Sequence, residues 1–141
     1  MKRFAIFCLA VSLTAFVSCS RDTDQSTVPY LIFGHSYGEC LGGHCLDVFK
    51  LTDSALYEDK DDKFVSGDYR WYELSASKFS LARDLLKQTP EEIKYGVDQT
   101  FGCPDCHDQG ALIVHYFDGV HLHEFLLDND KSAIPVYLHS F

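Results

Sequence analysis

Basic residues are scarce in this sequence. Its 141 residues include 12 Lys and Arg against 21 Asp and Glu, so the formal net charge is −9. Proteins that bind nucleic acid or anionic headgroups need clustered Lys and Arg to neutralise phosphates. The composition therefore argues against nucleic acid as a partner.

The sequence also lacks an apolar run long enough for a membrane-spanning helix. Its main apolar run, from Phe4 to Val17, is shorter than the roughly 20 residues that a bilayer requires, and polar residues follow it at once. Lys2 and Arg3 precede this run, as in an export signal. We therefore expect residues 1–18 to be a signal peptide.

Some motifs for catalysis are missing as well. There is no phosphate-binding loop and no informative pair of carboxylates. The acidic run at 58–63 lacks the glycine and the final glutamate of a calcium loop, so a solvated turn is expected there. These absences favour a non-catalytic binding or interaction domain with a protein or glycan ligand.

The end of the predicted signal carries a recognisable motif. Phe16-Val17-Ser18-Cys19 resembles the lipobox of bacterial lipoproteins, although Phe16 stands where leucine is common. In that family the signal is cut before the cysteine, which then receives lipid. The resemblance implies a lipid anchor at Cys19, durable because acyl chains contribute about 0.8 kcal/mol per buried CH₂. The alternative is an ordinary signal peptide in which Cys19 is incidental.

This anchor sets the expected organisation and location of the chain. Residues 19–28 are small and polar and predict a tether, and residues 29–141 predict a single domain. The expected location is the cell envelope, with the chain attached by lipid to the outer membrane and facing the periplasm or the exterior.

Four cysteines lie in the predicted domain: Cys40, Cys45, Cys103 and Cys106. An even number of cysteines in an exported chain indicates disulfides, and four cysteines allow three connectivities. The short loops, with glycine or proline inside them, favour Cys40 with Cys45 and Cys103 with Cys106. A zinc knot made by the same four thiols is the alternative for an intracellular protein.

Cys103-Pro-Asp-Cys106-His107 matches the C-x-x-C-H pattern of c-type haem attachment. In this alternative function, electron transfer, both thiols bind haem and His107 is the proximal ligand. Met1 is the only methionine, so the distal ligand would be a second histidine, with five candidates: His35, His44, His115, His121 and His123. The motif lies late in the chain, before a predicted hairpin, which is unlike small cytochromes and favours a structural disulfide.

The segment Cys103-Pro-Asp-Cys106 also resembles the C-P-x-C active site of glutaredoxins. That resemblance implies thiol redox catalysis, in which a helix N-terminus stabilises the first thiolate. Little chain follows the motif here, and the acidic Asp105 and Asp108 disfavour a thiolate.

His121 and His123 alternate along a predicted strand, so they are expected on one face as weak candidates for zinc ligands. The expected register places His121 opposite Tyr116 and His123 opposite Val114. A third ligand is missing, so half-buried histidines on a wet sheet face are the alternative. No metal or other cofactor is predicted outside the haem alternative.

Two cysteine segments together carry a wider resemblance. Tyr37-x-x-Cys40-x-Gly42-x-x-Cys45 and Cys103-Pro-Asp-Cys-x-Asp-Gln-Gly110 are similar to segments of small lipoproteins from bacteria of the Bacteroidota type. The resemblance covers about residues 30–138 and implies structural cysteine pairs without implying an activity. Asp108 and Gln109 are also well suited to bonding loop amides.

Periodicity predicts an α+β domain: a small antiparallel sheet of four to five strands, one main helix and disulfide-stapled loops. Phe79, Ala82, Leu85 and Leu86 form one face of a helix over about 77–88, and Thr89-Pro-Glu-Glu resembles a capping box that opens a second one. A glycine-rich loop is expected at 34–43, and a final helical turn around Tyr137. The predicted strands are residues 30–33, 46–51, 69–74, 111–117 and 120–127, the last two joined by a two-residue turn at Asp118-Gly119.

Overall fold

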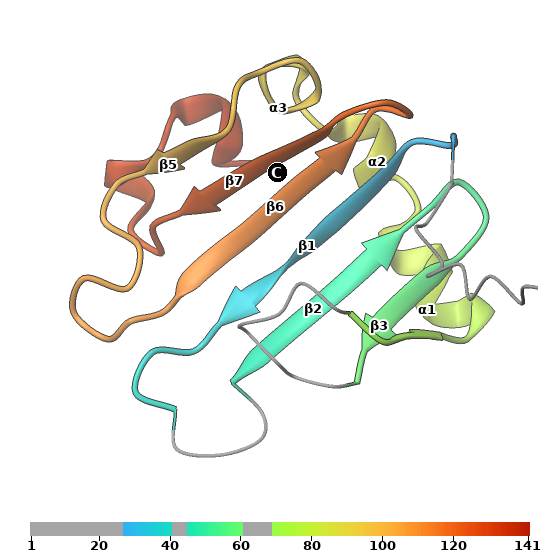
Figure 1. The fold of residues 1–141 in the computed structure, drawn as a ribbon, viewed down its shortest axis with the longest axis horizontal. Helices are drawn as coiled ribbons and strands as arrows, with labels where there is room; N and C mark the ends of the chain where they lie inside the picture. The colour runs from blue at the N-terminus through green and yellow to red at the C-terminus, as the bar shows by residue number, and fades with distance from the viewer. Residues whose placement is uncertain (1–26, 41–44, 61–68) are drawn as a thin grey trace, which may run out of the picture.

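A computed structural model describes residues 27–40, 45–60 and 69–141. The predicted signal peptide, the predicted lipidation site Cys19 and most of the predicted tether therefore lie outside the described residues. Four strands come first, followed by three short helices, three more strands and two 3₁₀ turns (Figure 1). In chain order these are β1 (Tyr30–Ser36), β2 (Leu46–Leu51), β3 (Leu56–Asp59), β4 (Trp71–Glu73), α1 (Ala76–Ala82), α2 (Leu85–Gln88), α3 (Glu91–Lys94), β5 (Gln99–Phe101), β6 (Ala111–Phe117), β7 (Leu122–Leu127), η1 (Lys131–Ala133) and η2 (Val136–Leu138).

The strands form one seven-stranded sheet in the order β4-β3-β2-β1-β6-β7-β5. Neighbours are antiparallel except for β5 and β7, which run parallel. The α+β class is confirmed, but the expectation of four to five antiparallel strands is wrong, because the sheet is larger and mixed. The two strands missed from the sequence are short, and β5 is an edge strand whose pairing with β7 depends on a distant segment.

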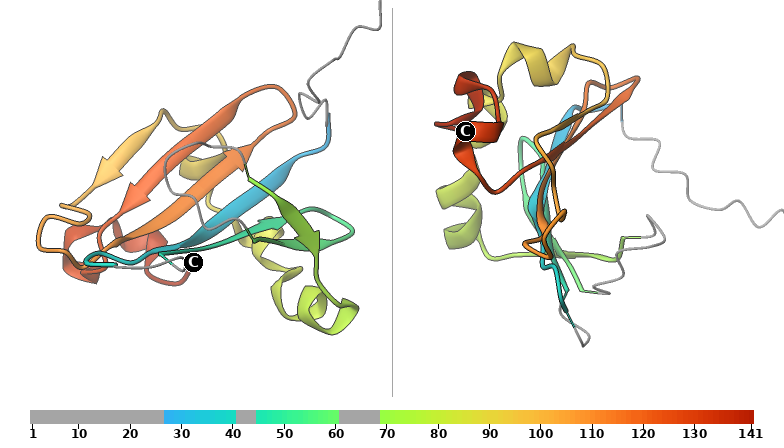
Figure 2. Two further views of the ribbon diagram at one scale, coloured as in Figure 1. Left: turned by 60° about the horizontal axis from the view of Figure 1, so that its bottom comes forward. Right: turned by 90° about the vertical axis from the view of Figure 1, so that its left-hand side faces the viewer.

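The helices and the 3₁₀ turns all pack on one face of the sheet, as the edge-on view shows (Figure 2). Because strand side chains alternate, Leu31, Val114 and Phe125 point into this core, where Ile93 of α3 meets them. A second, smaller apolar cluster covers part of the opposite face and is built from Ile32, Leu46, Val48 and Ile113, with Tyr69 and Trp71 packed on it. We call this second side the open face.

The predicted helix at 77–88 is present as α1 and α2, which Arg83 and Asp84 separate. The predicted helical turn after Thr89 is also present as α3, but the capping role of Thr89 is wrong. Thr89 is buried, and its hydroxyl donates to the Leu85 carbonyl oxygen at 3.0 Å. The N-cap position belongs to Pro90, since the Thr89 side chain is used by the preceding helix.

The predicted hairpin of β6 and β7 is confirmed, with a different turn and register. Asp118 Oδ1 accepts the N–H groups of Val120 and His121, each at 2.7 Å. This lengthens the connection to residues 118–121, so that His123 lies opposite Tyr116, and Val114 lies opposite Phe125. The expected two-residue turn at Asp118-Gly119 is wrong, because the Asp118 side chain, and not only Gly119, fixes the conformation of the loop.

Two local expectations need correction. The glycine-rich loop begins later than expected, because β1 continues through Gly34, where a Cβ would lie 2.1 Å from the Asp47 carbonyl oxygen. Residues 41–44 lie outside the described residues. The acidic run is not wholly a solvated turn either: Asp59 is buried in β3 and accepts the Arg70 N–H at 2.6 Å, while residues 61–63 are not described.

Within the part of the chain described above, no helix combines the length and apolar character needed to cross a membrane.

Candidate functional site

The four domain cysteines form the two expected local disulfides. The Cα atoms are 5.4 Å apart in Cys40–Cys45 and 5.5 Å apart in Cys103–Cys106. Because each sulfur is bonded to a partner, the four do not form a zinc knot in this structure. The first bridge lies within the β1–β2 connection, where Cys45 directly precedes β2. The second bridge lies in the β5–β6 connection.

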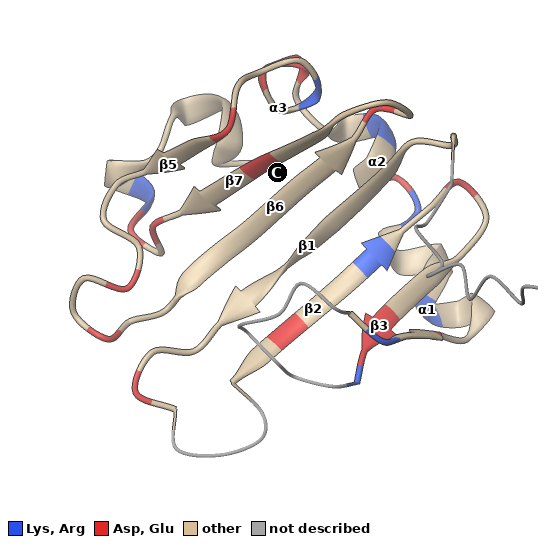
Figure 3. Ribbon diagram, viewed as in Figure 1, with Lys and Arg blue, Asp and Glu red and all other residues tan. Residues whose placement is uncertain are grey.

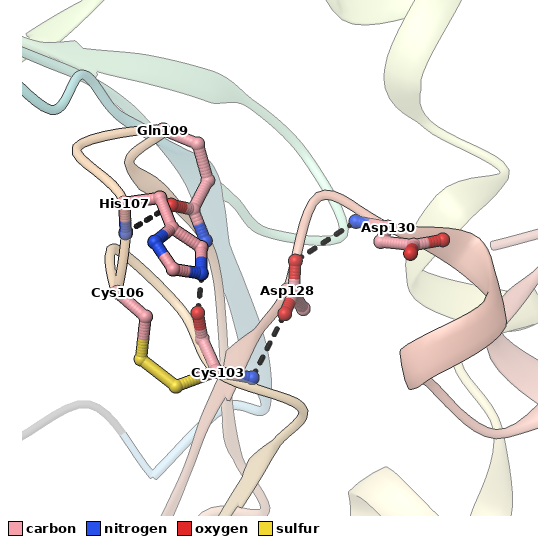
Figure 4. The surroundings of a disulfide bond; sticks show 6 residues. All are labelled: Cys103, Cys106, His107, Gln109, Asp128 and Asp130. Atoms are coloured by element: carbon pink, nitrogen blue, oxygen red, sulfur yellow. Dashed lines mark hydrogen bonds between the residues drawn. A yellow bond between two sulfur atoms is a disulfide. The ribbon is translucent and has the colours of Figure 1, made fainter.

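Residues 103–110 form a loop that its own side chains hold closed (Figure 4). The Gln109 amide donates to the Cys103 carbonyl oxygen at 2.8 Å and accepts the His107 N–H at 2.7 Å. The Asp105 carboxylate accepts the Gly110 N–H at 3.0 Å. Gln109 thus bonds loop amides as expected, while Asp105 takes the role foreseen for Asp108.

A second segment, residues 128–130, fastens this loop to the end of β7. The Asp128 carboxylate accepts the N–H of Asp130 at 2.9 Å and that of Cys103 at 2.8 Å (Figure 4). These two hydrogen bonds, that of Asp130 first, lower the pKa of Asp128 below its ordinary value. The Asn129 amide also donates to the Gln109 carbonyl oxygen at 2.6 Å.

Beside this junction lies a groove of about 430 Å³ between the sheet and the C-terminal segment, which we call the sheet–tail groove. Most of its lining is apolar and comes from β1, β2, β6, β7, α2 and the tail: Phe33, Phe49, Leu85, Leu112, Val114, Leu127, Ile134, Leu138 and Phe141. Phe33, Phe49, Leu112, Ile134 and Phe141 are only half-buried, so an apolar surface stays accessible in the groove.

Polar side chains also line the groove: His35, Asp47, Asp128, Asn129, Lys131 and His139. The Asn129 amide lies 3.3 Å from His35 Nε2, and the Tyr37 hydroxyl donates to Asp47 at 2.6 Å. A mostly apolar cavity with a few fixed polar groups is the usual form of a small-molecule site.

The haem alternative required free thiols at Cys103 and Cys106, which are here bonded to each other. The groove beside Asp128 is lined by no residue from 103 to 107, so it offers no haem pocket next to the exposed His107. The proposed distal histidines are scattered: His35 lines the groove, His115 lies on the open face, and His44 is not among the described residues.

His121 and His123 do not lie on one strand, because the longer turn leaves His121 in the loop. Both rings approach Asp118 Oδ2, with ring nitrogens at 3.8 and 3.5 Å, and His123 Nδ1 is bonded to the Gly96 carbonyl oxygen at 2.7 Å. Across residues 27–40, 45–60 and 69–141, no group of three His, Cys, Asp or Glu is placed to hold a metal ion.

The open face carries a second hollow, of about 450 Å³, over β6 and β7. Here His115 Nδ1 lies 3.6 Å from Glu124 Oε1, and burial lowers the pKa of His115 while Glu124 and Asp98 partly oppose the shift. The Tyr69 ring lies 4.9 Å from the Trp71 ring, tilted by 35°, and Tyr69 also lines this hollow.

Four aromatic residues with exposed or half-buried rings, Tyr37, Tyr69, Trp71 and Tyr72, do not form one surface for a ligand. Tyr69 and Trp71 pack on the open face, Tyr37 lies against His35 at 4.6 Å, and Tyr72 lies beside Arg70.

Sequence reasoning missed the groove and the part played by residues 128–130. The run Asp128-Asn129-Asp130 directly after an apolar strand was a usable signal, since Asp and Asn side chains often bond nearby backbone amides. The groove itself had no local signal, because it is lined from several separate segments. Comparisons with family models, with curated proteins and with solved structures found no match to this chain.

Proposed function

We propose that this chain is a lipid-anchored protein of the bacterial cell envelope that binds a small amphiphilic ligand in the sheet–tail groove, without catalysis. The observation that carries the proposal is the apolar groove itself, whose half-buried lining is continuous with polar side chains. The anchor follows from the lipobox ending at Cys19 and from the polar tether after it.

The chemistry of the lining defines the ligand class. Phe33, Leu112 and Phe141 suit a short hydrocarbon chain or a ring, since apolar burial is the main source of affinity in such a cavity. Asn129 and His35 offer hydrogen-bond partners to a hydroxyl-bearing head, which a sugar group would supply. A strongly anionic head is disfavoured by Asp47 and Asp128 beside them.

The test uses the full chain, exported, lipidated and held in lipid nanodiscs, and titrated with hexyl glucoside. Backbone NMR signals of groove residues such as Leu112, Asn129 and Phe141 are expected to shift and saturate. Phe141→Ala removes a lining ring and is expected to raise the Kd about fivefold, equivalent to roughly 1 kcal/mol.

The matched control is Val136→Ala, in the same tail segment. Val136 is 79% exposed and does not line the groove, so its Kd should equal that of the wild type. Shifts confined to the open face, or an equal response of both variants, would contradict the proposed site.

A further inference from the structure

The two disulfides differ in their access to solvent. Cys103 and Cys106 are both exposed, whereas Cys40 and Cys45 are half-buried. Thiol–disulfide exchange requires direct approach of an attacking thiolate to a sulfur, so access governs which bridge reacts. The Cys103–Cys106 bridge is therefore the one that an external thiol meets first.

This exposed bridge is connected to the sheet–tail groove by hydrogen bonds. Cys103 donates its N–H to Asp128, and the Gln109 carbonyl accepts from Asn129. Asp128 and Asn129 both line the groove, and Asn129 in turn reaches His35, another lining residue. Gly102, at φ +75°, packs so closely that a Cβ there would lie 2.6 Å from the Asp128 Cβ.

The loop that contains the bridge, residues 103–110, holds an unusual backbone conformation. Asp105 and Asp108 have φ of 57° and 58°, in the left-handed region that non-glycine residues rarely adopt. Such residues persist only where their surroundings fix them, and the cross-link between Cys103 and Cys106 is one of those constraints. Removing the cross-link is expected to let the loop relax and release its bonds to Asp128 and Asn129.

We propose that Cys103–Cys106 is a reversible thiol–disulfide exchange site whose oxidation state controls ligand affinity in the sheet–tail groove. This inference rests on the proposed binding function of that groove. In the oxidised state the loop holds Asp128 and Asn129 in the groove wall. In the reduced state these residues lose their loop partners and affinity falls.

The reductant is a dithiol. One of its thiolates attacks a sulfur of the bridge, forming a mixed disulfide and releasing the other cysteine as a thiolate, which takes up a proton. The second thiol of the reductant then attacks the mixed disulfide and releases the second cysteine. Two electrons and two protons reach the protein, and the dithiol becomes a disulfide.

The surroundings make this bridge a target of exchange and not a catalyst of it. Residues 102–110 contain two aspartates and no Lys or Arg, and the ribbon of this connection in Figure 3 carries the colour of acidic residues but not that of basic ones. A catalytic thiolate needs positive charge or a helix N-terminus close to it, and β5 and β6 flank this loop instead.

The experiment exposes the lipidated full chain in nanodiscs to graded dithiothreitol, alkylates free thiols and locates them by peptide mass. We expect Cys103 and Cys106 to be alkylated first and the hexyl glucoside Kd to rise about fivefold or more at that stage. Equal reduction of both bridges, or an unchanged Kd once Cys103 and Cys106 are reduced, would overturn the proposal.

Two double variants provide matched controls. The variant Cys103→Ser with Cys106→Ser should bind hexyl glucoside as weakly as the reduced wild type. Its Kd should not change when dithiothreitol is added. Cys40→Ser with Cys45→Ser should keep the dithiothreitol response, and loss of that response would contradict the assignment to Cys103–Cys106.

A second measurement separates failure of the redox proposal from failure of the groove. Amide hydrogen exchange at Cys103 and Asp130, both donors to Asp128, should accelerate on reduction whether or not a ligand binds. If oxidised protein binds no probe, the binding function fails, and accelerated exchange at these two amides still supports a redox-controlled junction. Unchanged exchange overturns the redox proposal.

Discussion

At the scale of single residues, backbone contacts decide which side chains are tolerated around the candidate site. Gly110 has φ +74°, and a Cβ there would lie 1.8 Å from the Ser36 carbonyl oxygen. Its N–H is bonded to Asp105, so the residue fixes both the end of the cysteine loop and its junction with β1. Nothing in the sequence distinguishes this glycine from one in an ordinary turn.

Gly110→Ala is therefore expected to destabilise the domain strongly. The left-handed backbone and the collision with Ser36 together should cost about 2–4 kcal/mol. Urea unfolding of the oxidised protein measures the loss. Ser140→Ala, at an exposed position, serves as control and should stay within about 0.5 kcal/mol of the wild type. Equal stability of the two variants would contradict the structural role of Gly110.

At the scale of elements, the β6–β7 hairpin shows how one carboxylate sets a register. Asp118 accepts two backbone N–H groups, which lengthens the turn and moves His123 opposite Tyr116. The same hydrogen bonds, that of His121 first, lower the pKa of Asp118 to about 2. The residue that shapes the hairpin is thus also an acid-sensitive one.

Asp118 is expected to make hairpin stability depend on acid. Its pKa in the folded chain lies below the ordinary value of 3.8, so its contribution is complete above pH 3.8 and is lost as the pH falls through about 2. Asp118→Asn should lower the Tm at pH 6 and remove this part of the acid dependence. Thermal unfolding of both proteins from pH 6 to pH 2 measures the difference. If the Tm of both proteins falls in the same way between pH 6 and pH 2, Asp118 does not contribute to the acid dependence of stability.

At the scale of the whole molecule, the sheet brings distant segments into one structure. β1, near the start of the domain, pairs with β2 and also with β6, which follows some 75 residues later, as in the bond between Ser36 and Ala111. The sheet–tail groove forms only after this pairing, when the C-terminal segment packs on the covered face. A ligand site of this kind depends on the complete domain.

The mass of the intact chain tests the organisation proposed for the molecule. Purified through its own signal from a bacterium able to attach haem, the protein should start at Cys19, carry acyl groups and lose two hydrogens for each of its two disulfides. Alkylation after reduction should reach all four domain cysteines. A mass increased by one haem, with Cys103 and Cys106 resistant to alkylation, would instead support the cytochrome alternative.

Local pattern and covalent geometry were enough to predict part of this protein. The spacing of the cysteines predicted both disulfides, because cysteines separated by three and five positions in the sequence can be joined without help from the fold. Alternation of apolar residues predicted β6 and β7, and helical periodicity predicted the helices at 76–88. The lipobox and the binding function it accompanies stay predictions from the sequence.

The tertiary structure decided the rest, because the deciding contacts join residues far apart in the chain. Residues 99–101 form the strand β5 because they pair with β7. Thr89 is buried against α2, so its hydroxyl donates to the Leu85 carbonyl oxygen and does not cap the next helix. Asp128 and Asn129 acquire a role only where the cysteine loop meets them at the groove. Local sequence patterns do not predict these long-range contacts, because the contacts depend on which strands become neighbours in the sheet.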